Sequence, residues 1–288
     1  MSAAARAGGI LVVGDVIDDT VVIPSRPIRP DTDTASTIRR VAGGSAANTA
    51  AWLAALGADV TFVGAVNRAD VERHTALLPG VDVHLQAVDA ATGAIIVIVQ
   101  GAERSMLTDR GANAELDFEA IPDELMRAHV HVHLTGHSMA ASDGTASARF
   151  LRRAKASGAT VSVSPGSVAY IEALGAERFG EVIAGADVVF ASLAEGAALA
   201  GAEEPTAIAA RVQAPTLVLT LGADGVIVEG EHFAAVTAPI AIDPTGAGDA
   251  FCAGFLARWV QDHDAAAAAR AGTEVAARAV GVVGGRPA

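Results

Sequence analysis

The sequence predicts an α/β protein in which a doubly wound, mostly parallel sheet carries helices on both faces. Short, fully apolar runs such as residues 10–13 are typical of strands buried on both faces of a parallel sheet. Helical segments such as residues 46–57 lie between these runs, and alternating strands and helices favour parallel βαβ units. Two extended segments without a helical period, at about 20–41 and 92–110, predict a small β lid over the carboxyl ends of the strands. We expect residues 1–288 to form one domain.

Composition limits the classes of function. Hydrophobic residues make up 51% of the 288 residues and aromatic residues only 4%, so the core is expected to consist mainly of Ala, Val, Leu and Ile. The formal net charge of −13 offers no basic footprint for nucleic acid or an anionic membrane, so an anionic cosubstrate needs a local site, with a divalent cation. Cys252 is the only cysteine, and no apolar run is long enough for a signal peptide or a membrane helix. We expect a cytoplasmic protein.

Three carboxylates follow the first predicted strand. Residues 10–13 end at Gly14, and Asp15, Asp18 and Asp19 come directly after it. They are either solvated loop residues or acceptors for the hydroxyls of a polyol, because a site at the carboxyl end of a parallel strand needs acceptors in fixed directions.

A glycine pair precedes the first predicted helix. Gly43 and Gly44 allow backbone to approach a ligand closely, and Asn48 offers both a donor and an acceptor from the first helical turn. A glycine pair before a helix is a weak signal when it stands alone.

Four histidines lie in or near the strand expected around residue 131. His129, His131 and His133 alternate with valines, so on a strand they share one face, and this spacing could chelate a metal ion. No acidic or cysteine partner with a familiar spacing is nearby, which favours neutral histidines on a covered face. His137 follows the strand and is the better candidate for a substrate contact, because it would emerge at the carboxyl end.

The second half of the chain repeats the alternation of helix and strand. The predicted elements are helix 143–158, strand 160–164, strand 187–192, strand 215–221 and helix 265–282. The basic residues of helix 143–158 favour a solvated face over a binding patch.

The heptapeptide DPTGAGD, residues 243–249, leads into an apolar helix over residues 250–260. The backbone N–H groups of Gly246, Ala247 and Gly248 can therefore converge at a helix N-terminus, where unpaired amides and the helix dipole favour an anion such as phosphate.

Asp249 lies at the edge of this predicted anion hole. A carboxylate is electrostatically unfavourable beside phosphate unless it has a task, and the obvious task is to accept the proton of a hydroxyl that attacks the phosphorus. The alternative is that Asp249 is only a helix N-cap and the glycines only a turn.

This heptapeptide resembles the C-terminal signature of the ribokinase, or PfkB, family of carbohydrate kinases, DTxGAGD, with Pro244 as a departure. The resemblance implies a ribokinase-like fold. It also implies that Asp249 is the catalytic base and that the backbone of Gly246, Ala247 and Gly248 forms the anion hole.

The same resemblance extends to the N-terminal region. The family's sugar-binding signature has a glycine pair followed by Asn, which implies substrate contacts from Gly44 and Asn48. The family also has a sugar-binding Asp five residues after a Gly, a spacing that Gly14 and Asp19 share.

On the nucleotide side, the family's Asn-x-x-Glu stands here as Ser192-Leu-Ala-Glu195. The resemblance implies that Glu195 orients magnesium-bound water, and the Ser at position 192 weakens that match. The stretch TLGADG resembles the family's nucleotide loop, which assigns Thr220, Gly222 and Gly225, together with Ser192, to cosubstrate binding.

The resemblance implies ATP and Mg²⁺ as cofactors, and a K⁺ or other monovalent-cation site at Asp243 and Thr245. It also implies a homodimer that pairs through the lid. The expected reaction is transfer of the γ-phosphoryl group of ATP to a hydroxyl, a primary alcohol, of a sugar or sugar-like molecule.

Three other functions stay open. A nucleoside kinase of the same family would need aromatic residues for base stacking, and residues 15–113 offer only Trp52 and Phe62, both in expected core positions. A catalytically weak sugar or nucleoside sensor would use the same cleft. A dinucleotide-binding enzyme is disfavoured, because no G-x-G-x-x-G follows the first strand.

Overall fold

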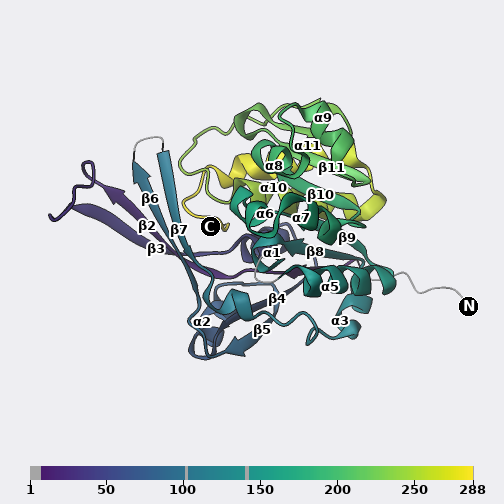
Figure 1. Ribbon diagram of the computed structural model, residues 1–288, viewed down its shortest axis with the longest axis horizontal. Helices are drawn as coiled ribbons and strands as arrows, with labels where there is room; N and C mark the ends of the chain where they lie inside the picture. The colour runs from purple at the N-terminus through teal and green to yellow at the C-terminus, as the bar shows by residue number, and fades with distance from the viewer. Residues whose placement is uncertain (1–7, 101–102, 140–142, 288) are drawn as a thin grey trace, which may run out of the picture.

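The computed structural model describes residues 8–100, 103–139 and 143–287. They form a nine-stranded sheet flanked by helices and a separate four-stranded sheet that projects from it (Figure 1). The large sheet has the order β13-β12-β11-β10-β9-β8-β1-β4-β5, and its pairs are parallel except β11 with β12 and β12 with β13, which are antiparallel. Its strands are β1 (Ile10–Val13), β4 (Val60–Asn67), β5 (Asp82–Val88), β8 (His131–Thr135), β9 (Thr160–Ser164), β10 (Val188–Ser192), β11 (Thr216–Thr220), β12 (Val226–Val228) and β13 (Glu231–Phe233).

Helices cover both faces of this sheet. The described helices are α1 (Ser45–Ala55), α2 (Val71–Ala76), α3 (Asp123–Ala128), α4 (Gly136–Met139), α5 (Thr145–Ala156), α6 (Val168–Leu174), α7 (Ala176–Ile183), α8 (Leu193–Ala200), α9 (Pro205–Arg211), α10 (Ala247–Asp262) and α11 (Ala265–Ala279). Short 3₁₀ turns are η1 (Arg68–Asp70), η2 (Gly111–Glu115) and η3 (Gly222–Asp224). The mostly parallel, doubly wound sheet predicted from the sequence is confirmed.

The two faces of the sheet carry separate hydrophobic cores. Ile10 and Val12 of β1 pack into a core with α1, α10 and α11, whereas Leu11 and Val13 pack into the core with α3 and α5 to α9. This division follows from the two-residue period of a strand, and it explains why β1 is apolar at every position.

The second sheet is the predicted lid. It has the order β3-β2-β6-β7, and in Figure 1 it extends as a long arm from the body. Its strands are β2 (Ile17–Pro24), β3 (Ser36–Gly43), β6 (Gly93–Gln100) and β7 (Glu103–Asp109), so β2 begins three residues before the predicted start of the lid at about residue 20. Its exposed large apolar side chains are Ile23, Ile38, Ile96, Met106 and Leu107.

A buried asparagine fixes the junction between lid and body. The side chain of Asn113 accepts a hydrogen bond from the N–H of Val16 at 3.0 Å and donates one to the carbonyl of Val16 at 2.9 Å. Because Val16 lies between β1 and β2, this pair holds the turn from which the lid rises, directly above the carboxyl end of β1.

The histidines around β8 differ from the expectation of three on one strand face. The strand begins at His131, so His129 lies before it and contacts the Leu125 carbonyl and the Thr61 hydroxyl. His131 and His133 do share a face, where both contact the hydroxyl of Ser162. The described part of the chain holds no group of three or more His, Cys, Asp or Glu side chains placed to bind a metal ion.

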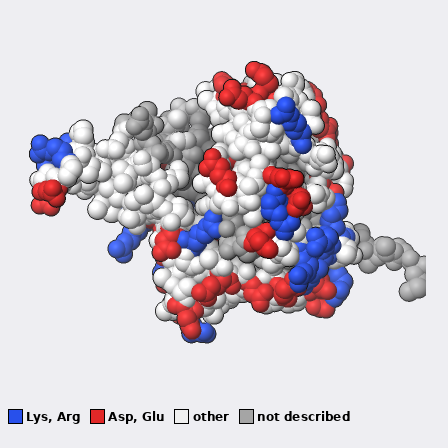
Figure 2. All heavy atoms as spheres, in the orientation of Figure 1, with Lys and Arg blue, Asp and Glu red and all other residues white. Residues whose placement is uncertain are grey.

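On the face in view, acidic and basic side chains are interspersed over the body, and the charged side chains of the lid gather mainly at its tip (Figure 2). Within the described ranges, none of the helices has the length and apolar character needed to cross a bilayer.

Candidate active site

The site is built around the start of α10. Gly246 is the residue before this helix and has a left-handed backbone, with φ of 76°. A Cβ at this position would lie 2.4 Å from the Cα of Gly285, so only glycine fits. The carboxylate of Asp243 accepts the N–H of Thr245 at 2.9 Å and so shapes the loop. The first-turn amides point to the end where an anion would lie; that of Ala247 also donates to the carbonyl of Pro244 at 3.3 Å, and those that follow have no carbonyl acceptor within the helix.

Asp249 lies inside the first turn of α10. The N-cap position belongs to Gly246, so the interpretation of Asp249 as only an N-cap is wrong. Its Oδ2 accepts a hydrogen bond from Nδ2 of Asn48 at 2.9 Å. Removal of this carboxyl from water raises its pKa to about 7, with a further rise from Asp15 and Asp19, while the bond from Asn48 lowers the pKa. A carboxyl with a pKa near neutrality suits a general base.

The first of the three aspartates after β1 is structural. Asp15 is buried, and its carboxylate accepts the N–H of Ser45 at 2.8 Å and of Ala46 at 3.2 Å. The hydroxyl of Thr135 donates to the same carboxylate at 2.7 Å. Asp15 therefore caps α1 and ties it to β8, a role that the sequence reasoning missed.

The other two aspartates differ in their partners. Asp18 accepts two hydrogen bonds of 2.7 Å from the guanidinium of Arg73 on α2, which occupies it at the base of the lid. Burial raises the pKa of Asp19 to about 7, and its Oδ1 is buried with no hydrogen-bond partner among the described residues. A buried acceptor without a partner is costly, so Asp19 is the aspartate of the three that is poised to take a ligand hydroxyl.

Gly44 and Asn48 lie beside Asp19. Gly44 precedes α1 with φ of 93°, and a Cβ there would lie 2.5 Å from the carbonyl oxygen of Asp15. The carboxylate of Asp19 packs against the Cα of the neighbouring Gly43, where a Cβ would lie 2.1 Å from its Oδ2. The structure therefore brings Asp19, Gly44, Asn48 and Asp249 together from three distant parts of the sequence.

His137 comes from another element, the short helix α4. Its side chain is buried just past β8, and its Nδ1 lies 2.8 Å from the hydroxyl of Tyr170. Burial lowers the pKa of His137, and its Nε2 has no hydrogen-bond partner among the described residues. The guanidinium of Arg110 lies over the Tyr170 ring, 5.0 Å from its centre. Tyr170 is an aromatic residue that sequence reasoning missed, because it lies outside residues 15–113, where aromatic residues for base stacking were expected.

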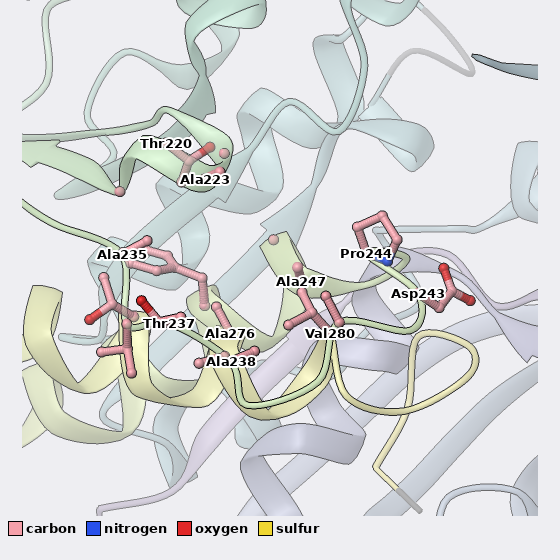
Figure 3. Close-up of a pocket in the computed structure, with 18 of the residues that line it drawn as sticks. Thr220, Ala223, Ala235, Thr237, Ala238, Asp243, Pro244, Ala247, Ala276 and Val280 are labelled. Atoms are coloured by element: carbon pink, nitrogen blue, oxygen red, sulfur yellow. The ribbon is translucent and has the colours of Figure 1, made fainter. Parts of the chain in front are cut away.

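A cavity of about 670 Å³ lies on the other side of the α10 N-terminus. Thr220, Gly222 and Gly225 line it together with Ala247 and Gly248, so the predicted nucleotide loop and the predicted anion hole face one space. In Figure 3, Thr220 and Ala223 lie on one side of this cavity, Ala276 of α11 and Val280 just after that helix on the other, and Asp243 and Pro244 at one end.

Ser192 and Glu195 do not line this cavity. The Ser192 hydroxyl accepts the N–H of Glu195 at 3.2 Å, and Oε2 of Glu195 accepts the N–H of Ser192 at 2.7 Å. The two side chains form a capping box at the start of α8. Ser-x-x-Glu is the sequence signature of this motif, a signal that sequence reasoning overlooked. Burial raises the pKa of Glu195.

Arg286 is a further residue that sequence reasoning missed. Its guanidinium donates to Oδ1 of Asn48 at 3.3 Å and to the carbonyls of Leu77 and Gly43. No local pattern could have found it, because the residue is a lone arginine in the Gly-rich segment GGRPA, 238 residues from Asn48.

Comparisons with known proteins agree with this geometry. Residues 8–288 match the model of the pfkB family carbohydrate kinases. An ATP-dependent ribose-1-phosphate kinase of Halopiger xanaduensis is 34% identical over 247 residues, which are 82% of this chain and 80% of that protein. A fructokinase of Klebsiella pneumoniae is 32% identical over 270 residues, 87% of this chain and 84% of that protein.

A solved structure shows the same fold. The adenosine kinase from Sinorhizobium meliloti has a TM-score of 0.85 to this chain, covers 98% of it with 96% of its own length, and is 24% identical in sequence. The nine-stranded sheet, the lid and the match over residues 8–288 lead to one conclusion: the chain belongs to the pfkB family of carbohydrate kinases, ATP-dependent phosphotransferases with an alcohol group as acceptor.

Proposed function

We propose that this kinase phosphorylates a hydroxyl, a primary alcohol, of a sugar or sugar-like molecule, with Asp249 as the general base. One observation carries the proposal. The carboxylate of Asp249 contacts Asn48, which marks the substrate side, while Gly248, the preceding residue in the first turn of α10, lines the 670 Å³ cavity. A base in that position can reach an acceptor hydroxyl on one side while the phosphoryl donor lies on the other.

In the proposed step, the sugar is held by Asp19, Gly44 and Asn48. His137 of α4 makes a further contact with the sugar. Asp249 takes the proton of the acceptor hydroxyl as its oxygen bonds to the γ-phosphorus. The bond between that phosphorus and the bridging oxygen of ADP breaks, and ADP leaves with the electron pair. Negative charge on the moving phosphoryl group is stabilised by the backbone amides of the anion hole, Gly246, Ala247 and Gly248.

The cavity walls suit the nucleotide. Its lining is mainly small and apolar, and Asp243 is its one charged residue. We assign Thr220, Gly222 and Gly225 to contacts with ATP, whose phosphates would point toward the α10 N-terminus. In this arrangement the adenine would lie against α11 near Thr273.

The residues present fit Mg²⁺ only through water and phosphate. Mg²⁺ is commonly held by one or two carboxylates plus substrate phosphates, and the described residues offer no ready cage of three ligands. We assign Glu195 to a magnesium-bound water, with Ser192 holding Glu195 through the capping box. When bound, the ion would neutralise charge on the phosphates.

A monovalent cation such as K⁺ is proposed for the loop at Asp243 and Thr245. The carboxylate of Asp243 accepts the backbone N–H of Thr245 and that of Gly284, which places a negative charge within this loop. Replacement of K⁺ by a large organic cation in the assay is expected to lower turnover, and unchanged turnover would contradict this assignment.

The substrate test is a panel. ADP release from Mg·ATP is measured with ribose 1-phosphate, fructose, other pentoses and hexoses, keto-deoxy sugar acids, and nucleosides, with Asp249→Asn as the control. Turnover on one class that disappears in the variant would support the proposal. Silence across the panel, with ATP still bound, would count against it and favour the sensor interpretation.

We also propose that two copies pair through the lid. Ile38, Ile96 and Leu107 share one face of the lid sheet and are 63%, 42% and 58% exposed, which is unfavourable for large apolar side chains unless something covers them. A second lid, which carries the same apolar side chains, is the occupant that we propose for this face. Light scattering is expected to give the mass of a dimer, and Leu107→Glu is expected to give a monomer. A monomeric wild type would refute this pairing.

A further inference from the structure

The chain segment from Gly284 to Arg286 returns to the centre of the site. The N–H of Gly284 donates to Asp243 at 3.1 Å, and the indole of Trp52 on α1 donates to the carbonyl of Gly285 at 2.9 Å. A Cβ at Gly285 would lie 2.3 Å from Nδ2 of Asn48, so this segment packs directly against the side chain that contacts Asp249.

Arg286 is held by three acceptors from three elements. Its Nε donates to Oδ1 of Asn48 in α1 at 3.3 Å, one terminal nitrogen donates to the carbonyl of Leu77 after α2 at 3.0 Å, and the other donates to the carbonyl of Gly43 at the end of β3 at 2.9 Å. A guanidinium presents its donors as a rigid fork, so these bonds define its position closely.

The contact with Asn48 selects one orientation of the amide. Because Arg286 can only donate, Oδ1 of Asn48 must face it, and Nδ2 is then the atom that faces Asp249. With the amide reversed, an oxygen would lie against the carboxylate of Asp249, and two acceptors would repel each other.

We propose that Arg286 is a positioning residue for phosphoryl transfer: it fixes the amide of Asn48 so that Asn48 donates to Asp249, and its charge stabilises the ionised carboxylates of the site. The inference rests on the proposed role of Asp249 as base.

The charges around Arg286 support this role. Asp15, Asp18, Asp19 and Asp249 all act on Arg286 to raise its pKa, against the larger effect of burial, which lowers it to about 10. Arg286 therefore stays charged at neutral pH, and its charge lowers the pKa of Asp19 against the larger effect of burial, which raises it.

The same charges disfavour Arg286 as an anchor for a phosphorylated substrate. Each of the three guanidinium nitrogens already donates a hydrogen bond, and a phosphate bound there would lie among carboxylates.

Several groups surround Asp249 and would act on its titration. They are Asp15, Asp19, Ser45, Asn48, Thr49, Cys252 and Arg286, and Glu195 acts in turn on Cys252.

The test uses Arg286→Gln, with Arg286→Lys as the conservative variant. Arg211→Gln is the matched control, because Arg211 also donates to two backbone carbonyls, those of Ala200 and Gly201, but caps the end of α8 instead. Carboxyl ¹³C resonances of aspartate-labelled protein are titrated without any substrate, and Asp249→Asn identifies the Asp249 signal.

In Arg286→Gln the pKa of Asp249 is expected to rise by about half a unit to one unit, because a nearby positive charge is lost. Arg286→Lys should keep most of the charge effect, and Arg211→Gln should change nothing. An unshifted titration in Arg286→Gln would overturn the inference, whichever acceptor the enzyme uses.

The kinetic readout is a pH profile on the acceptor that the panel identifies. In Arg286→Gln, kcat is expected to fall about 10- to 100-fold, the acid limb to move to higher pH, and the KM for ATP to stay within about twofold. Arg286→Lys should recover the acid limb but little of kcat, because an ammonium cannot hold Asn48 and two carbonyls at once.

Two outcomes separate the possible failures. A rise only in the KM of phosphorylated sugars, with kcat and the pH profile unchanged, would overturn the inference and assign Arg286 to binding of an anionic substrate. If the titration shifts in Arg286→Gln but the wild-type protein phosphorylates no acceptor, the proposed function fails, while the effect of Arg286 on Asp249 through Asn48 and through its charge stands.

Discussion

At the scale of single residues, the three aspartates after β1 show how a few positions decide the role of a carboxylate. The carboxylate of Asp15 binds the N-terminus of α1 and that of Asp18 binds Arg73, whereas Asp19 keeps a buried oxygen with no hydrogen-bond partner in the described part of the chain. All three follow one strand, and their chemistry differs only because their hydrogen-bond partners come from different elements. The catalytic assignment therefore depends on partners, which lie far away in the sequence.

A glycine substitution tests the packing at the α10 N-terminus. In Gly246→Ala the new methyl group would meet the Cα of Gly285, and its left-handed backbone adds strain. We expect a loss of about 3 kcal/mol or more in the free energy of unfolding. Gly57→Ala is the control, since Gly57 has a similar φ of 81° but open space around its Cα, and should cost only about 1 kcal/mol. Urea unfolding measures both, and equal losses would show that the contact with Gly285 is unimportant.

At the scale of elements, the start of α10 separates two compartments. Asp249 faces Asn48 and α1, whereas Ala247 and Gly248 face the cavity that α11 closes. One helix turn therefore supplies the base to one compartment and backbone amides to the other. This division predicts that changes on α11 affect nucleotide binding without affecting the base.

The substitution Ala277→Leu tests that division. Ala277 lines the cavity, so a larger side chain takes space from the nucleotide, and we expect the KM for ATP to rise roughly 10- to 100-fold with kcat within about threefold. Ala267→Leu lies on the same helix outside the cavity lining and serves as the control. If both variants raised the KM equally, the cavity would not be the nucleotide site.

The strands, the lid and the heptapeptide at 243–249 could be predicted because their signals are local. Fully apolar runs, extended segments and a Gly-rich turn before a helix each lie within about ten residues. The capping box of Ser192 and Glu195 is an equally local signal, because Ser-x-x-Glu spans only four residues. Arg286 was beyond reach, because its role comes from a contact across 238 residues that only the folded chain creates.

At the scale of the whole molecule, burial shifts the pKa values of two sets of groups in opposite directions. Burial lowers the pKa of His133 to about 4, so the folded state disfavours its protonated form. Stability from this residue is present above about pH 6.5 and is lost as pH falls toward 4. The raised pKa values of Asp19 and Asp249 act oppositely, because protonation of these carboxyls on acidification favours the folded state.

Substitution of His133 separates these effects. His133→Gln removes the loss of stability that His133 causes on acidification. Between pH 7 and about pH 4.5, the free energy of unfolding of this variant should therefore fall by about 2 kcal/mol less than that of the wild type. His84→Gln is the control, because His84 is nearly half exposed and is expected to follow the wild type. Urea unfolding at the two pH values gives the comparison, and parallel behaviour of the two variants would refute a role for His133.

The central claim, that Asp249 is the base of a sugar kinase, is tested most directly by kcat and ATP affinity in Asp249→Asn beside the wild type. We predict that kcat falls by roughly two to four decades, since a general base contributes about that much, while ATP affinity is little changed. The wild type should also show an acid limb near pH 7 that the variant lacks, because the pKa of Asp249 is raised to about 7. Turnover close to that of the wild type in Asp249→Asn would contradict the mechanism.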